Sequence, residues 1–185
     1  VPRLVLHART GGVDVFSTHL SWQLHDSALR ERQVRVLVDV VAACSDPAAA
    51  VGPVVGADLN AEPDSTVVRY LSGLATLDGH ATYLQDAWRL AGDGGAGTTW
   101  SNANPHAALD GEADKRIDYV LSGFHGPALG GRPVECRVVG DAHDSTVKFR
   151  PIDPKDVGRK WRRYRDFKIE VDASETGMVK SASFS

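Results

Sequence analysis

The segment of residues 54–65, VVGADLNAEPDS, constrains the fold of this chain more than any other. Its first four residues form a short apolar run that is typical of a buried strand. In an extended segment every second side chain points the same way, so Asp58 and Asn60 are expected to share one face at the end of that strand. Pro63 then restricts the backbone of the turn that follows.

The pair of Asp58 and Asn60 has two interpretations when only the residues are considered. A carboxylate can accept a proton from water, and an amide can both donate and accept hydrogen bonds, so the pair could align a water molecule against a phosphate. Asp and Asn also bond to their own backbone in turns, and an ordinary Asx turn at a strand end explains the same residues. Both interpretations are open at this point.

The composition is that of a soluble globular protein. The 185 residues are 42% hydrophobic and 24% charged, which suffices for one buried core. No run of about 18 apolar residues indicates a membrane span, and the first residues lack the order of a signal peptide, so a soluble and cytoplasmic protein is expected. The two cysteines, Cys44 and Cys136, are too few for a disulfide framework and are expected to be free thiols.

Charge divides the chain into two parts. Residues 144–185 hold 10 of the 21 Lys and Arg but only 7 of the 24 Asp and Glu, in a chain whose net charge is -3. Residues 159–165, RKWRRYR, suit phosphate backbones and stacked bases, although a solvated basic helix face or tail has the same composition. We predict one domain over residues 1–145 and a basic C-terminal segment over residues 146–185.

Hydrophobic periodicity predicts an α+β fold. Strands are predicted over residues 4–6, 13–20, 54–57, 98–100, 115–121 and 133–139, and the first two form a hairpin around a glycine pair. Helices are predicted from Asp26 or Ser27 to a point before Pro47, after a Ser65 cap to about residue 72, and over residues 84–91. Strands and helices alternate without a regular βαβ rhythm, which favours helices layered over sheets.

Polar side chains that could do chemistry recur at strand ends or just beyond them. They are His19, Asp58, Asn60, Asp118, Asp141, His143 and Asp144. A lone histidine at a strand end is most often a surface residue, whereas Asp118 in a strongly β segment must be either exposed or paired. The set is more informative than any of its members.

Six short blocks of sequence contain or flank most of these polar residues. They are STHL at 17–20, RERQ at 30–33, VGADLNAEP at 55–63, DAW at 86–88, TW at 99–100 with NP at 104–105, and RIDYV at 116–120. In this order they resemble the endonuclease/exonuclease/phosphatase superfamily, the deoxyribonuclease I-like metal-dependent phosphoesterases, from about residue 13 to residue 121. The resemblance implies part of a four-layer α/β sandwich, with two mixed β-sheets flanked by helices and an active site along the strand ends at one edge.

The resemblance also implies a function, namely hydrolysis of a phosphodiester or phosphomonoester by activated water. A nuclease would be one enzyme of this kind. In the matching positions, Asp58 polarises or deprotonates the water, and Asn60 contacts the phosphate and holds Asp58. His19 donates to a phosphate oxygen. Asp118 orients His143 and sets its tautomer.

Further residues follow from the same resemblance. It implies Mg²⁺ or Mn²⁺ as the cofactor, for which Asp144 and Asp141 are the candidate ligands. It implies a phosphate-ester substrate, with nucleic acid as one candidate. Trp100, Asn104 and Arg116 are the candidate substrate-binding residues.

Two departures from the family pattern bear on activity. The family normally begins with a strand that carries an Asn, followed by a Gln-Glu pair whose Glu binds the metal, and nothing before Val13 matches either. The N-terminal third of the fold is therefore expected to be absent, and the start of the chain is expected to be processed or truncated. Ala142 also stands where the family has a metal-binding acid. The alternative function is a catalytically inactive relative that binds phosphate, nucleic acid or a protein partner, which would cover the incomplete sandwich.

Overall fold

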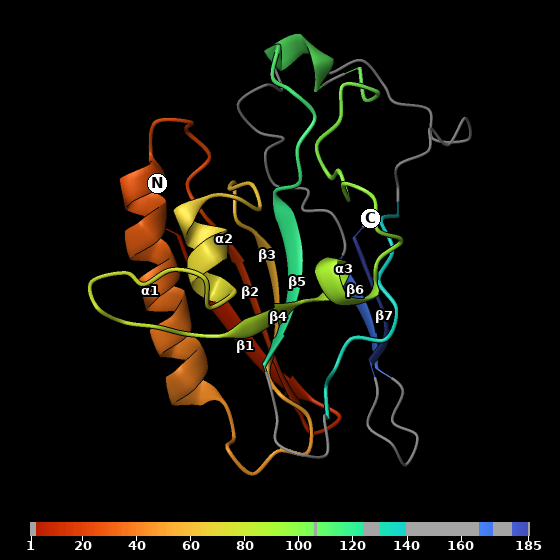
Figure 1. The fold of residues 1–185 in the computed structure, drawn as a ribbon. Helices are drawn as coiled ribbons and strands as arrows, with labels where there is room; N and C mark the ends of the chain where they lie inside the picture. Colours follow the sequence, from red (N-terminus) through yellow and green to blue (C-terminus); the bar gives the residue numbers. More distant parts are fainter. Residues whose placement is uncertain (1–2, 106, 124–129, 140–166, 172–178, 185) are drawn as a thin grey trace, which may run out of the picture.

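A five-stranded mixed β-sheet forms the centre of the computed structural model, which describes residues 3–105, 107–123, 130–139, 167–171 and 179–184 (Figure 1). The strands, in the order β1-β2-β3-β5-β4 across the sheet, are β1 (Val5–Thr10), β2 (Val13–His19), β3 (Val54–Asp58), β5 (Asp118–Gly123) and β4 (Leu84–Asp86). β2 and β3 run parallel, and the other neighbouring strands run antiparallel. A separate antiparallel pair consists of β6 (Phe167–Val171) and β7 (Val179–Phe184).

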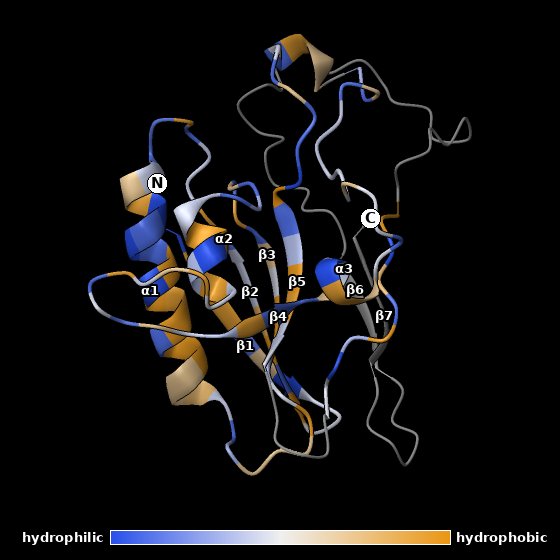
Figure 2. Ribbon diagram, in the orientation of Figure 1, coloured by the Kyte–Doolittle hydropathy of each residue, from blue (hydrophilic) through white to orange (hydrophobic). Residues whose placement is uncertain are grey.

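Two helices cover one face of the sheet (Figure 1). They are α1 (Ser27–Cys44) and α2 (Thr66–Leu71), and the described chain also contains α3 (Ala87–Ala91) and a 3-10 turn over Ala108–Asp110. Figure 2 shows that the second half of α1 is largely hydrophobic and the first half largely hydrophilic. α2 begins at Ser65, whose side chain accepts a hydrogen bond from Val68 N and so satisfies one of the free N–H groups at a helix start. None of the helices in the described ranges has the length and apolarity of a membrane-spanning segment.

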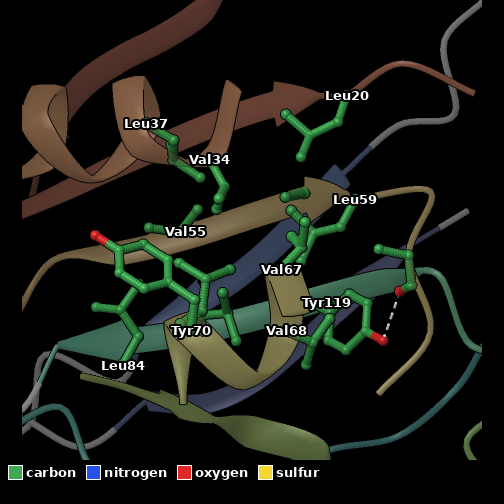
Figure 3. Packing of buried hydrophobic residues seen from close by; sticks show 14 of the residues in the cluster. Leu20, Val34, Leu37, Val55, Leu59, Val67, Val68, Tyr70, Leu84 and Tyr119 are labelled. Carbon is green, nitrogen blue, oxygen red and sulfur yellow. Dashed lines mark hydrogen bonds between the residues drawn. The ribbon is translucent and has the colours of Figure 1, made fainter. Parts of the chain in front are cut away.

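The main core lies between the sheet and these two helices. Phe16, Val55 and Leu121 occupy directly paired positions of β2, β3 and β5, and they belong to one core cluster with Leu37 of α1 and Tyr70 of α2. All five side chains are fully buried, and Figure 3 shows Val55 packed with Leu37 and Tyr70. Burial of each such side chain contributes roughly 1.5–3 kcal/mol relative to exposure. This packing fixes which face of each strand points toward the helices.

The intervening residues of the same strands point to the opposite face. There Val13, Val54 and Val120 form a smaller cluster with Val51 and Ala87, and the half-buried Cys136 packs against it. His19, Asp58 and Asp118 follow the alternation of this second face, because each lies an even number of residues from one of these valines. The sheet therefore separates its core from its polar strand ends.

Most of the predicted elements are confirmed. The N-terminal hairpin, α1, β3, α2 and β5 form where they were expected, with β1 extending to Thr10 and β5 beginning at Asp118. The α+β class is confirmed by the mixed sheet and its covering helices. Cys44 and Cys136 are free thiols, as expected.

Three predictions of secondary structure are wrong. Residues 84–91 are not one helix, because Leu84–Asp86 pairs with β5 as β4 and only the residues after Asp86 are helical. Residues 98–100 contribute a single bridge from Trp100 to Lys115 instead of a strand. Residues 133–139 form no strand, because Cys136 N donates to Ala91 O and the segment packs against the end of α3 instead of pairing in the sheet.

Candidate functional site

His19, Asp58 and Asp118 lie side by side on three neighbouring strands. His19 pairs with Asp58 across the parallel strands β2 and β3, and Asp58 pairs with Asp118 across the antiparallel strands β3 and β5. Directly paired residues of adjacent strands project their side chains to the same face. Three polar side chains that are distant in the sequence therefore form one row at an end of the sheet, and we call this row the strand-end row.

His19 and Asp58 are in contact within the strand-end row. His19 Nε2 lies 3.4 Å from Asp58 Oδ2, and the two side chains are 43% and 28% exposed, so both are reachable from solvent. Burial lowers the pKa of His19, the nearby Arg3 cation lowers it further, and the Asp118 carboxylate opposes them. The lowered pKa favours the neutral ring, which retains one N–H donor.

Asn60 does not continue the strand, so the expectation that it shares a face with Asp58 by strand alternation is wrong. β3 ends at Asp58, and Asn60 adopts a left-handed conformation with φ of 47°, which Asn tolerates better than most residues. Asn60 N donates to Asp58 Oδ1 at 3.0 Å, and Asn60 Nδ2 donates to Leu20 O at 3.1 Å. The Asx turn is thus present, and it holds one oxygen of Asp58 while the other oxygen faces His19.

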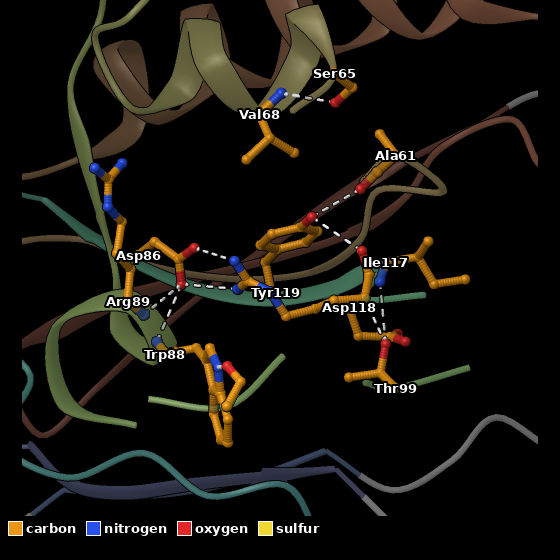
Figure 4. Close-up of polar contacts among 12 residues, drawn as sticks. Ala61, Ser65, Val68, Asp86, Trp88, Arg89, Thr99, Ile117, Asp118 and Tyr119 are labelled. Carbon is orange, nitrogen blue, oxygen red and sulfur yellow. Dashed lines mark hydrogen bonds and ion pairs between the residues drawn. The ribbon is translucent and has the colours of Figure 1, made fainter. Parts of the chain in front are cut away.

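The start of β5 is fixed by a threonine from a distant part of the chain. Thr99 Oγ1 accepts hydrogen bonds from Ile117 N and Asp118 N, both at 3.1 Å, as Figure 4 shows. Ile117 O accepts from Leu59 N at 2.8 Å and so joins β5 to the end of β3. These bonds hold the backbone of Asp118 next to Asp58.

Tyr119 ties the same region to the loop after Asn60. Its hydroxyl lies 2.8 Å from Ala61 O and 3.0 Å from Arg116 O, and it can donate to either carbonyl. The ring is 1% exposed, and burial raises the pKa of the phenol far above its ordinary value of 10.0. Tyr119 therefore acts as a neutral donor that positions the loop.

Arg116, a predicted substrate-binding residue, is engaged inside the protein. Its Nη1 and Nη2 atoms lie 3.0 Å and 2.8 Å from the two carboxylate oxygens of Asp86. The guanidinium also lies over the ring of Tyr119, 4.5 Å from its centroid. These contacts use Nη1 and Nη2 within the protein, and the part of Arg116 in substrate binding stays a prediction.

The other predicted substrate-binding residues lie beyond the start of β5. Trp100 is half-buried, bridges to Lys115 by its backbone, and has the Lys115 Nζ 5.4 Å from its ring centroid. Asn104 is exposed in the loop that follows. Their part in substrate recognition stays a prediction.

Asp141, His143, Asp144 and the basic run at 159–165 lie outside the described residues.

Arg3 is a candidate that the sequence did not reveal. Its charge is close enough to His19 to lower the pKa of that ring, and its buried Nε atom has no hydrogen-bond partner among the described residues. The hairpin register, in which Val5 pairs with Thr18, brings the residues before β1 to the His19 end of β2. Only the pairing of β1 with β2 indicates that Arg3 lies near His19, because a single arginine has no distinctive sequence pattern.

The described residues do not by themselves make a Mg²⁺ or Mn²⁺ site. No three His, Cys, Asp or Glu side chains gather as metal ligands in the part of the chain that the structure describes. Asp58 and Asp118 are the carboxylates of the strand-end row, and Asp58 Oδ1 already accepts from Asn60 N. Mg²⁺ requires near-octahedral coordination by hard oxygen ligands, which this pair alone does not complete.

Comparison with known proteins gives matches only among solved structures. No family model matches the chain, and no curated protein matches it. Truncated Caenorhabditis elegans TDP2 is 27% identical with a TM-score of 0.43, covering 64% of this chain and 45% of that chain. D. rerio TDP2 complexed with single strand DNA product is 21% identical with a TM-score of 0.48, covering 65% and 46%. The human Nocturnin catalytic domain with bound sulfate anion is 20% identical with a TM-score of 0.41, covering 60% and 35%.

TDP2 and Nocturnin belong to the endonuclease/exonuclease/phosphatase superfamily. It is the superfamily that the six sequence blocks of this chain resemble. This chain spans less than half the length of each of these structures. Since all three TM-scores are below 0.5, the similarities carry no argument about what this chain does.

Proposed function

We propose that this chain carries the water-activating and phosphate-contacting side of a phosphoesterase site. The observation that supports this most directly is the strand-end row, in which His19, Asp58 and Asp118 occupy paired positions on adjacent strands. A row set by strand pairing is better defined than one set by loops.

The proposed chemistry starts at Asp58. With Oδ1 held by Asn60 N, its carboxylate has a defined orientation, and Oδ2 accepts a hydrogen bond or a proton from the attacking water. His19, in its neutral form, donates to a phosphate oxygen beside that water. The Arg3 cation stabilises the negative charge that develops on the phosphoryl oxygens.

Several finer predictions belong to the same proposal. The sheet is one half of a four-layer α/β sandwich, and residues 1–145 form the phosphoesterase-like domain ahead of the basic segment at 146–185. His143 is the proposed partner of Asp118. Mg²⁺ or Mn²⁺ is the proposed cofactor, with Asp141 and Asp144 as its predicted ligands.

Hydrolysis can be tested with bis(4-nitrophenyl) phosphate and with single-stranded DNA, each in the presence of Mg²⁺, Mn²⁺ or chelator. We expect Asp58→Asn to lower turnover by about 10²–10⁴-fold, the usual contribution of a positioned acid or base. Asp78→Asn is the matched control, because Asp78 is exposed in another turn, has φ of 50°, and sits in a conformation that Asn accepts. Wild-type turnover no faster than that of Asp58→Asn with every metal would refute the proposal.

A second candidate function is a binding module without catalysis. It is favoured by the basic run at 159–165, whose composition suits phosphate backbones and stacked bases. Binding of a fluorescent single-stranded oligonucleotide should then weaken steeply with salt and survive Asp58→Asn. Binding that is absent, or that does not depend on salt, would exclude this function.

A further inference from the structure

A groove of about 380 Å³ is lined by Asn60 and Ile117, which lie two residues after Asp58 and one residue before Asp118 of the strand-end row. Its walls come from the segment after β2, which contributes Trp22 and Leu24, from the starts of α1 and α2, from the loop after β3, and from Lys115 ahead of β5. Asn60 lines the groove and also donates its backbone N–H to Asp58 Oδ1. A ligand in the groove therefore lies next to the residue that holds the proposed water-activating carboxylate.

The apolar side of the groove is presented by a segment with a defined backbone. Trp22 and Leu24 are 63% and 68% exposed. The buried guanidinium of Arg30 donates to the carbonyls of Ser21, Gln23 and Leu24 at 3.1, 2.6 and 3.3 Å. Gln33 adds two bonds to Ser21, one from its amide nitrogen to Oγ and one from Ser21 N to its amide oxygen. Because its carbonyls are held in this way, the segment offers an exposed indole ring without the ordering cost of a loose loop.

The charges that line the groove are mainly negative. Its carboxylates are those of Glu31, Glu62 and Asp64, and none of the three has an ion-pair partner among the described residues. Its two cations are both engaged. Arg30 is bound to backbone carbonyls, and Lys115 pairs with Glu112. Hydrogen bonds to carbonyls do not cancel the charge of Arg30, so the three carboxylates face this one cation. The lining is therefore negative overall, which repels an anion and attracts a cation.

We propose that this groove binds the organic group of the phosphoester substrate, and that this group has an apolar face and carries no negative charge. An aromatic or aliphatic group would pack on Trp22, and a cationic group would gain both from the ring face and from the acids. A nucleic-acid strand, which brings one phosphate charge per nucleotide, is disfavoured there. The link of this group to a phosphate rests on the proposed function, whereas the selectivity of the groove rests on its own residues.

Three ligands that share a phenyl ring and differ in charge test the selectivity. Benzyltrimethylammonium, benzyl alcohol and benzoate are titrated into the full chain at low salt by calorimetry. We expect the cation to bind most tightly and benzoate most weakly. Trp22→Ala should weaken binding of the cation by about two- to fivefold, the range of an exposed cation–π contact. The double variant Glu62→Gln/Asp64→Asn should reduce the preference for the cation over benzoate.

The control is Leu109→Ala, which removes an 84% exposed apolar side chain that does not line the groove and should leave binding unchanged. Trp22 is also mostly exposed, so its replacement should not unfold the chain, and a thermal melt checks this. Equal affinity for benzoate and the cation, no effect of Trp22→Ala, or no binding of any ligand would overturn the proposal. None of the ligands contains phosphate, so such a result leaves the Asp58 hydrolysis assay unaffected, and a failed hydrolysis assay leaves the selectivity of the groove standing.

Discussion

Loss of Arg116, which lies just ahead of β5, should strongly destabilise the fold. In the folded chain the Asp86 side chain is 4% exposed and the Arg116 side chain 8% exposed. Asp86 accepts two hydrogen bonds from Arg116, at 3.0 and 2.8 Å, and two weaker ones from Trp88 N and Arg89 N. Arg116→Met removes both charged donors and leaves a buried carboxylate with backbone donors alone.

The expected cost is about 3–5 kcal/mol of unfolding free energy, the usual effect of breaking a buried pair from one side. That is a large part of the roughly 5–15 kcal/mol that stabilises a typical domain. Asp86→Asn in the same chain should restore part of the loss, because Asn is neutral and still accepts from the N–H groups at the start of α3. The double variant is therefore expected to be more stable than Arg116→Met alone.

Urea unfolding followed by tryptophan fluorescence measures these differences. Arg89→Met is the control, because Arg89 is exposed on α3 and its side chain has no ion-pair partner among the described residues, so the change should stay within about 0.5 kcal/mol. The reasoning is refuted if Arg116→Met costs less than about 1 kcal/mol, or if the double variant is less stable than Arg116→Met.

Two further predictions concern titration. NMR titration should place the pKa of His19 below its ordinary 6.5, because burial and then the Arg3 cation disfavour the charged ring. Arg3→Gln should raise this pKa. A wild-type value at or above 6.5 would contradict the placement of His19. The pKa of Asp14 is lowered from 3.8, first by the hydrogen bond from Asp46 N and then by His7. This carboxylate should stabilise the fold above the unfolded-state pKa and cease to do so as the pH falls through the lower folded-state pKa. Asp14→Asn should therefore flatten the loss of unfolding free energy in acid, and an unchanged acid slope would argue against the contact.

The local hydrophobic pattern was sufficient to predict those helices and strands whose burial follows from their own sequence. A short apolar run predicted β3, which is buried on both faces of the sheet, and helical spacing predicted α1, which buries one face against the main core. Residues 84–91 were mistaken for one helix because their composition favours a helix, whereas pairing of Leu84 with Gly123 draws the first three residues into the sheet. Residues 133–139 look like a strand, yet the described structure offers them a contact with the end of α3 instead of a sheet edge.

For the candidate site, too, some features could be predicted from the sequence and others could not. The sequence by itself determined which residue types stand at strand ends, namely His19, Asp58 and Asp118, because a strand end follows from local hydrophobicity and turn residues. Only the tertiary structure decided that these three form a row, that Asn60 leaves the strand to hold Asp58, and that Arg3 joins them. The physical reason is that hydrogen-bond register between strands is set by packing of the whole sheet against its helices, and no local stretch of sequence contains that information.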